Sequence, residues 1–162
     1  MINTYHLFAV PLIQTKLVIQ HSLLNKIKNW CIENNKNNDL FSIRKGFQEH
    51  EKFEGKEELD EIINNFFKIY FTQKIHNSWL NVLNKSGQNV PHVHTGDDVV
   101  NSAVLYLTNK NSTITFIQNS QIFNYEPQLF DLLIFPSSLV HQVSVHTNDE
   151  IRISYAMNTM KL

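Results

Sequence analysis

The segment FDLLIFPSSLVH, residues 130–141, joins an apolar strand to a proline turn and to a histidine that leads the next strand. Short apolar runs bounded by turn-forming residues are typical of buried strands. Residues from Ser78 onward alternate with a period of two, which extends this pattern over the second half of the chain. We therefore predict seven or eight short strands arranged as a sandwich or jelly roll. Further strands are expected at 103–107, 113–117 and 151–156, with turns at 84–87, 108–111 and 147–149.

The first half of the chain, residues 1–76, is predicted to be mainly helical. An apolar run interrupted by a proline, residues 7–13, is expected to form an edge strand. A helix should begin after an N-cap at Ser22, because apolar residues then recur at spacings of three and four. A second amphipathic helix is predicted from Lys56 to Gln73, whereas residues 42–56 have no clear periodicity.

The length of 162 residues corresponds to one domain, residues 1–162. Its mainly helical part, 1–76, would support a core of strands at 77–162. The predicted fold class is therefore α+β: a double-stranded β-helix (jelly-roll) core with the N-terminal helices packed on one sheet.

Composition excludes several classes of protein. The formal net charge of −1 argues against nucleic-acid binding by bulk electrostatics. The single cysteine, Cys31, excludes a disulfide scaffold and fits a reducing compartment, so a cytoplasmic location in a bacterial cell or phage-infected host is expected. No stretch approaches the roughly 18 apolar residues of a membrane span, and no membrane partner is expected.

The histidines indicate a metal site. His92 and His94 are two residues apart, a spacing that places both side chains on one face of a strand. His141 leads a later strand, which a barrel would bring next to them. Three protein ligands on one face leave three octahedral positions open, as in non-haem Fe(II) oxygenases. His146 is predicted to be exposed, and His6, His21, His50 and His76 are predicted to be surface or half-buried side chains.

Arg152, one of two arginines, lies in an otherwise apolar strand. A guanidinium that points into a barrel is costly unless an anion meets it. Ser154 shares a face with Arg152, so the pair could hold a carboxylate. Alternation leaves open which face points inward, because Ile153 and Tyr155 are also large and apolar.

These residues resemble the 2-oxoglutarate/Fe(II)-dependent oxygenases, and most closely a small bacterial and phage subfamily of them. The specific part of the resemblance is Phe-Pro-Ser-x-Leu-x-His-x-Val at 135–143 together with Arg-Ile-Ser-x-x-x-Asn at 152–158. Supporting parts are Leu-Phe-x-x-Pro at 7–11, Trp-x-Asn at 79–81, His-x-His-x-Gly at 92–96, Ser102 and Tyr-Leu at 106–107.

The resemblance implies a dioxygenase that uses Fe(II) and 2-oxoglutarate, with release of succinate and CO2. It implies that His92 and His141 are iron ligands. Arg152 and Ser154 would bind the distal carboxylate of 2-oxoglutarate, assisted by Tyr106. Asn81 would line the cavity and touch cosubstrate or substrate.

One position departs from the superfamily pattern. The second ligand there is an acidic residue two positions after the first histidine, and this chain has His94. We favour His94 as the third metal ligand, because strand parity places it beside His92. The alternative is that Asp98 or Asp97 supplies a carboxylate while His94 lies behind the metal ligands.

Two other functions remain open at the level of sequence. A cupin-like metalloprotein could use the three histidines without 2-oxoglutarate, and Arg152 with Ser154 would then lack an obvious partner. A non-enzymatic jelly-roll binding module could bury the histidines in its core. The primary substrate fits a small molecule, a protein side chain or a nucleobase about equally well.

Overall fold

The computed structural model describes the chain except for residues 1, 8–9, 38–40, 97 and 110–111. Its helices are α1 (His21–Glu33) and α2 (Lys56–Phe71). Its strands are β1 (Asn3–Leu7), β2 (Val10–Lys16), β3 (Ile43–Glu49), β4 (Gln73–His92), β5 (Asn101–Tyr106), β6 (Ile114–Gln118), β7 (Gln121–Tyr125), β8 (Asp131–Pro136), β9 (Val140–Val143) and β10 (Arg152–Lys161).

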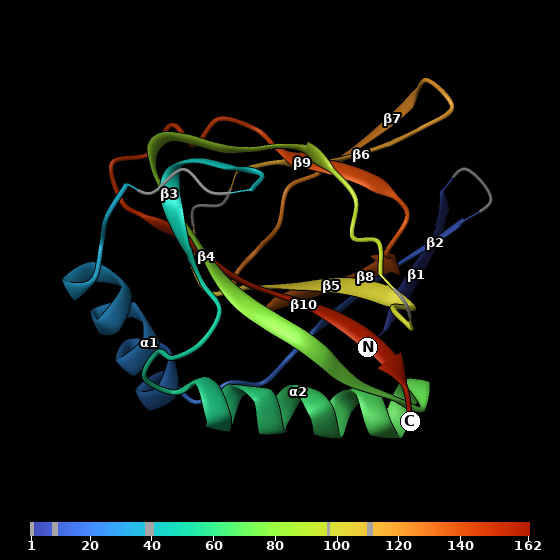
Figure 1. Cartoon of the computed structure of the whole chain (residues 1–162), viewed down its shortest axis with the longest axis horizontal. Coiled ribbons are helices and arrows are strands. Elements are labelled where there is room, and N and C mark those ends of the chain that lie inside the picture. The colour runs from blue at the N-terminus through green and yellow to red at the C-terminus, as the bar shows by residue number, and fades with distance from the viewer. Residues whose placement is uncertain (1, 8–9, 38–40, 97, 110–111) are drawn as a thin grey trace.

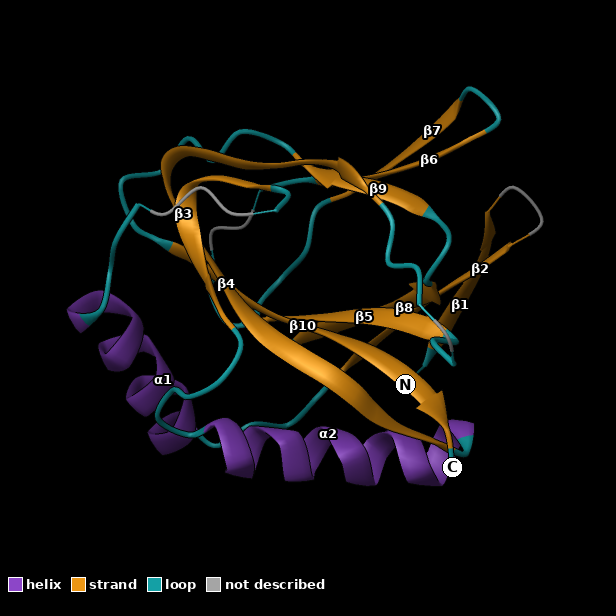
Figure 2. Cartoon of the chain, viewed as in Figure 1, coloured by secondary structure: helices purple, strands orange, loops and turns teal. Residues whose placement is uncertain are grey.

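The strands form one antiparallel sheet that curls into two layers (Figure 2). Their order is β1-β2-β8-β5-β10-β4-β9-β6-β7, and β3 pairs with β4 outside this path. The layer made by β8, β5, β10 and the first part of β4 lies over the helices, and β9, β6 and β7 lie in the opposite layer (Figure 1). The predicted α+β class, with helices on one sheet, is confirmed.

Strand β4 belongs to both layers. Its first part pairs with β10 as far as Leu83, and its end pairs with β9 through His92 and His141. Between these parts Ser86 has a φ of 67°, and the backbone N–H of Ser86 donates to the carbonyl of His146 at 2.7 Å. The turn predicted at 84–87 is therefore wrong. The same turn-forming residues bend a continuous strand without reversing it.

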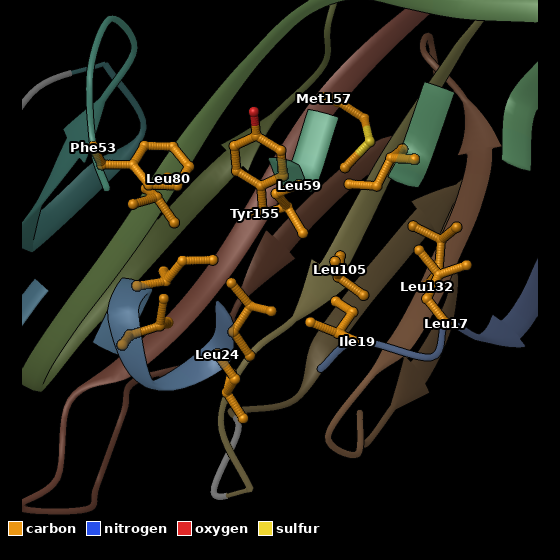
Figure 3. Packing of buried hydrophobic residues seen from close by; sticks show 14 of the residues in the cluster. Leu17, Ile19, Leu24, Phe53, Leu59, Leu80, Leu105, Leu132, Tyr155 and Met157 are labelled. Carbon is orange, nitrogen blue, oxygen red and sulfur yellow. The ribbon is translucent and has the colours of Figure 1, made fainter. Parts of the chain in front are cut away.

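The helices cover the outer face of the layer formed by β8, β5, β10 and the first part of β4. Buried positions of α1 and α2 recur at helical spacing, including Leu23, Ile27 and Cys31 in α1 and Leu59, Ile63 and Phe67 in α2. They pack against the outward side chains of β4, β5 and β10 in one apolar cluster (Figure 3). This cluster contains Leu80, Leu105, Ile153, Tyr155 and Met157.

Both helix boundaries differ from the prediction. Helix α1 begins at His21, and its N-cap Gln20 makes no side-chain capping hydrogen bond, so the N-cap predicted at Ser22 is wrong. Helix α2 ends at Phe71 because Thr72 adopts a left-handed conformation with φ 53°. Gln73 then starts β4 instead of ending the helix. Neither helix is long and apolar enough to cross a membrane.

The first half of the chain contains more strand than predicted. Of the edge strand predicted at 7–13, Leu7 ends β1 and residues 10–13 lie in β2, whereas residues 8–9 lie outside the described part. The edge position predicted for this segment is wrong for β2, because β2 pairs with both β1 and β8. Residues 43–49 form β3, whose period is hidden by a register shift between Arg44 and Gly46. A Cβ on Gly46 would lie 2.1 Å from the carbonyl oxygen of Val82, so the close approach of β3 to β4 requires glycine there.

Strand β7 was also absent from the prediction. It follows β6 through Asn119 and Ser120, whose φ values are 48° and 64°. Two successive residues of positive φ form the tight turn of a hairpin. The turn predicted at 108–111 reaches residues 110–111, which lie outside the described part.

Candidate metal centre and adjoining cavity

Three histidines, from β4, the segment after it and β9, lie close together. His92 ends β4 and is the cross-strand partner of His141 in β9. His94 lies two residues beyond the strand, where its backbone N–H donates to the carbonyl of Ser137 at 2.9 Å. One ring nitrogen from each histidine lies within 4.8 Å of the others, a spacing that could hold a metal ion. The structure therefore brings together the three histidines that the sequence singled out.

Hydrogen bonds orient each ring. The Nδ1 atoms of His92 and His141 face the carbonyl oxygens of Val90 at 2.7 Å and Leu139 at 3.0 Å. The Nδ1 of His94 faces Oδ1 of Asn158 at 2.8 Å. Because these oxygens only accept, Nδ1 carries the proton in each ring. Nε2 of all three rings is then left as a metal ligand.

Burial favours the neutral form of these rings. It lowers the pKa of His92 and His94, and it lowers the pKa of His141 to about 3, with the other histidines adding to the effect on His141. A neutral imidazole is the form that binds a metal ion. The donor set is therefore ready to bind a metal at neutral pH.

The acidic alternatives lie elsewhere. Asp98 is exposed, has a φ of 69° and does not belong to the three-histidine group. Asp97 lies outside the described residues.

Arg152 points into the barrel, which settles the face that alternation left open. It is 1% exposed, and its Nη1 donates to Oγ of Ser154 at 3.1 Å. The guanidinium lies 5.3 Å from the ring centroid of Tyr106. Cross-strand pairing aligns Ser154 with Tyr106 on one side and with Asn81 on the other. Arg152, Ser154, Tyr106 and Asn81 thus lie together around one side of the cavity.

This part of the site has unsatisfied hydrogen-bonding groups. Nε of Arg152 and the hydroxyl of Tyr106 are buried without a hydrogen-bond partner. Burial lowers the pKa of Arg152, and it raises the pKa of Tyr106 to about 12, although the charge interaction and the direct contact between the two side chains oppose both shifts. Buried polar groups are nearly always paired, so these two atoms indicate a ligand that accepts hydrogen bonds.

The three histidines and Arg152 line one cavity. The described residues around it include no carboxylate, so its fixed charge is positive. The lining consists of Gln48, Trp79, Asn81, Asn89, His92, His94, Val104, Tyr106, Ile114, His141, Val143, Arg152, Ser154 and Ala156.

Sequence reasoning gave no role to several of these contacts. Asn158 and Ser102 appeared only as parts of the resemblance, and the structure places both against His94: Oγ of Ser102 donates to Oδ1 of Asn158 at 2.9 Å. Asn158 shares strand parity with Arg152, which could have indicated its inward side chain. The sequence does not indicate that Gln48 and Asn89 point inward, because the bulge in β3 and the bend in β4 interrupt the alternation of inward and outward side chains.

The prediction that His146 is exposed is wrong. His146 is 1% exposed, with Nδ1 3.0 Å from Oγ of Ser112 and Nε2 2.7 Å from the carbonyl of Glu150. Its hydrogen bonds stabilise the connection between β9 and β10. It does not belong to the three-histidine group. His21, His50 and His76 are exposed, as predicted. The side chain of His6 lies outside the described part.

A family model matches part of the sequence. Residues 108–158 match the family described as "Putative 2OG-Fe(II) oxygenase". The matched range contains His141, Arg152 and Ser154, and it begins after His92 and His94. No curated protein matches the sequence.

Solved structures of similar fold include two prolyl hydroxylases and a protein with 2-oxoglutarate bound. A prolyl-4-hydroxylase from Pseudomonas putida is similar with a TM-score of 0.67 and 13% identity, over 93% of this chain and 92% of that one. A prolyl hydroxylase from Trichoplax adhaerens, in complex with a hypoxia inducible factor peptide fragment, gives a TM-score of 0.71 and 11% identity, over 93% and 83%.

A third is HygX from Streptomyces hygroscopicus, with nickel, 2-oxoglutarate and hygromycin B bound, at a TM-score of 0.63 and 9% identity over 93% and 82%. These similarities confirm the predicted jelly-roll fold. The family match is confined to residues 108–158, and beyond that range the comparisons show similarity of fold.

Proposed function

We propose that this protein is an Fe(II)- and 2-oxoglutarate-dependent dioxygenase that hydroxylates a primary substrate. The observation that carries the proposal is the presence, in one cavity, of a three-histidine donor set and a buried guanidinium with an unpaired Nε. A metal site alone fits many proteins, and a buried arginine alone fits several anions. Their combination fits a dicarboxylate bound beside a metal ion.

The proposed metal ligands are Nε2 of His92, His94 and His141. Support for His94 over Asp98 comes from the hydrogen bond to Asn158, which leaves Nε2 of His94 unprotonated among the other two rings. Three neutral ligands leave the full dipositive charge of the metal ion for the anionic cosubstrate.

Arg152, Ser154 and Tyr106 are the proposed anchors of the distal carboxylate of 2-oxoglutarate. A carboxylate would accept from Nε of Arg152 and from the hydroxyl of Tyr106, which are buried beside each other and make no well-aligned hydrogen bond. It would also neutralise the buried guanidinium. Asn81, the cross-strand neighbour of Ser154, lies beside this carboxylate site.

Fe(II) and 2-oxoglutarate, when bound, supply the chemistry that couples reduction of dioxygen and release of succinate and CO2 to oxidation of a substrate C–H bond. The residues of this chain hold and orient these groups. Apolar lining side chains, among them Val104, Ile114 and Ala156, limit the access of water.

The primary substrate is proposed to be a small molecule or a protein side chain, and the reaction is proposed to take place in the cytoplasm. Both classes of substrate are supported by the similar structures, one of which contains a peptide fragment and another hygromycin B.

An anaerobic titration tests the proposal. Fe(II) and 2-oxoglutarate added to the protein should produce a weak visible charge-transfer band. The band should require His141 and Arg152 and should survive Arg44→Ala, which changes an exposed arginine.

Other outcomes identify the competing functions. Metal binding without any effect of 2-oxoglutarate would support a cupin-like metalloprotein. Failure to bind Fe(II), with the fold intact by circular dichroism, would support a non-enzymatic module. Succinate formation during a screen of candidate substrates would then identify the primary substrate.

A further inference from the structure

We propose that three carboxamide side chains, Gln48, Asn81 and Asn89, form a subsite for the primary substrate. This set, here called the carboxamide wall, would bind an uncharged group that donates a hydrogen bond, either a hydroxyl or an amide N–H. The inference rests on the proposed function, because it concerns the space that the metal and 2-oxoglutarate leave in the same cavity.

The main observation is the hydrogen bonding of Asn89. It is 5% exposed and lines the cavity, and its Nδ2 donates to Oγ of Ser42 at 3.2 Å. Its Oδ1 is buried without a partner. Since Nδ2 is engaged by Ser42, Oδ1 is the atom of this amide that is available to a ligand. It can only accept, so the missing partner is a donor.

The position of this atom argues against a random packing defect. Within the described part of the chain, four buried side-chain atoms lack a hydrogen-bond partner. Three of them belong to residues of this cavity: Arg152, Tyr106 and Asn89. The proposed 2-oxoglutarate carboxylate accounts for the first two. A carboxylate cannot satisfy Oδ1 of Asn89, because both groups are acceptors.

Gln48 supplies a second acceptor. Its Nε2 donates to Oδ1 of Asn81 at 2.7 Å, and the two residues are cross-strand partners in β3 and β4. This hydrogen bond engages Nε2 of Gln48 and orients its amide, whose Oε1 can only accept. The same cross-strand row continues from Asn81 to Ser154, so the wall lies beside the proposed carboxylate site.

Charge narrows the class of ligand. The wall itself carries no charge, and no described residue of the cavity is acidic. Even with 2-oxoglutarate bound, Arg152 and a dipositive metal ion together carry more charge than the two carboxylates of the cosubstrate, so a cationic substrate group would meet a net positive site. An anionic group would leave Oδ1 of Asn89 unsatisfied. An uncharged donor satisfies both conditions.

Matched probes test this inference on protein loaded with Zn(II) and 2-oxoglutarate, with affinities measured by NMR titration. N-methylacetamide is compared with N,N-dimethylacetamide, and 2-methoxyethanol with 1,2-dimethoxyethane. Each pair differs in one donor hydrogen, and the two pairs separate an amide N–H from a hydroxyl. In at least one pair we expect the donor to bind about 2- to 10-fold more tightly, as one added hydrogen bond would produce.

Three variants locate the effect. Asn89→Leu should abolish the preference, and Asn89→Asp, which keeps an acceptor, should retain it. Gln118→Leu is the matched control, because Oε1 of Gln118 is also buried and unpaired but lies outside the cavity. This control should retain the preference. If Asn89→Leu does not fold, Gln48→Leu at a half-buried position should weaken the preference.

The outcomes are separable from those of the proposed function. Equal affinity within both probe pairs, or an unchanged preference in Asn89→Leu, would overturn the inference. Loss of 2-oxoglutarate binding in Asn89→Leu would also overturn it, because Asn89 would then serve the cosubstrate. Wild-type protein that does not bind 2-oxoglutarate would overturn the proposed function itself.

Discussion

Two polar clusters lie on opposite faces of β10, and they differ in whether their polar groups are paired. The outer cluster consists of Lys56, Asp60, Ser78 and Tyr155, and the inner cluster of Arg152, Ser154 and Tyr106. In the outer cluster, Nζ of Lys56 lies 2.6 Å from Asp60, 2.8 Å from Ser78 and 3.1 Å from Tyr155. The hydroxyl of Tyr155 donates to Asp60 at 2.5 Å. Its charges cancel and its groups are paired.

The inner cluster combines Arg152 and Ser154, alternate residues of β10, with Tyr106 of the neighbouring β5, and it is open. Its hydrogen bond from Arg152 to Ser154 leaves Nε of Arg152 and the hydroxyl of Tyr106 unpaired, and no carboxylate of the described chain meets its charge. The comparison shows how to separate structural from functional polar groups. A closed cluster stabilises the fold, whereas an open one stabilises a complex with a ligand.

Arg152→Met should have the largest effect and should separate the two clusters. It removes the charge and roughly keeps the volume, so we expect the affinity for 2-oxoglutarate to fall by about 100-fold or more. The free energy of unfolding should not fall, because the buried charge is uncompensated in the free protein. Titration with 2-oxoglutarate and denaturant unfolding measure the two effects. A marked loss of stability would place Arg152 with the structural residues.

Asn158→Leu tests the hydrogen-bonded pair of Asn158 and Ser102, which lies on the inner face of the sheet. Asn158 and Ser102 hold Nδ1 of His94, so losing the amide should lower the affinity for Fe(II) by about 10- to 100-fold. Asn77→Leu, at the exposed cross-strand neighbour of Asn158, is the control. Isothermal titration with Fe(II) under anaerobic conditions measures both variants. Unchanged affinity in Asn158→Leu would argue that His94 is not a ligand.

Tyr106→Phe should lower the affinity for 2-oxoglutarate by about 10-fold, because one hydrogen bond to a charged group is lost. The stability of the free protein should stay the same or rise slightly, since the removed hydroxyl has no partner. The same titration and melting experiments apply. Unchanged affinity would remove Tyr106 from the carboxylate site.

Tyr155→Phe should give the opposite pattern and the smallest effect. Removing this hydroxyl deprives Asp60 and Ser78 of a partner, so the free energy of unfolding should fall by about 1 kcal/mol. Affinity for 2-oxoglutarate should stay within about twofold, because the side chain lies on the far face of β10. A large loss of affinity here would contradict the separation of the two faces.

The sequence predicted which side chains lie close together better than it predicted the helices and strands around them. His92 and His94 could be paired from strand parity, and Arg152 stood out because a charge in an apolar strand needs a partner. The bend in β4 could not be predicted, because Asn84, Ser86 and Gly87 are equally suited to a reversal. His146 was misjudged because its partners, Ser112 and the carbonyl of Glu150, are set by tertiary packing alone.

The burial of Cys31 in α1 has a practical consequence. It is the only thiol of the chain, it is fully buried, and burial raises its pKa to about 12. Thiol reagents attack the thiolate, so the folded protein should resist labelling at neutral pH while any opening of the layer between helices and sheet exposes a reactive group. The rate at which Cys31 is labelled would therefore report how often that layer opens, and measuring it requires no substitution in the cavity.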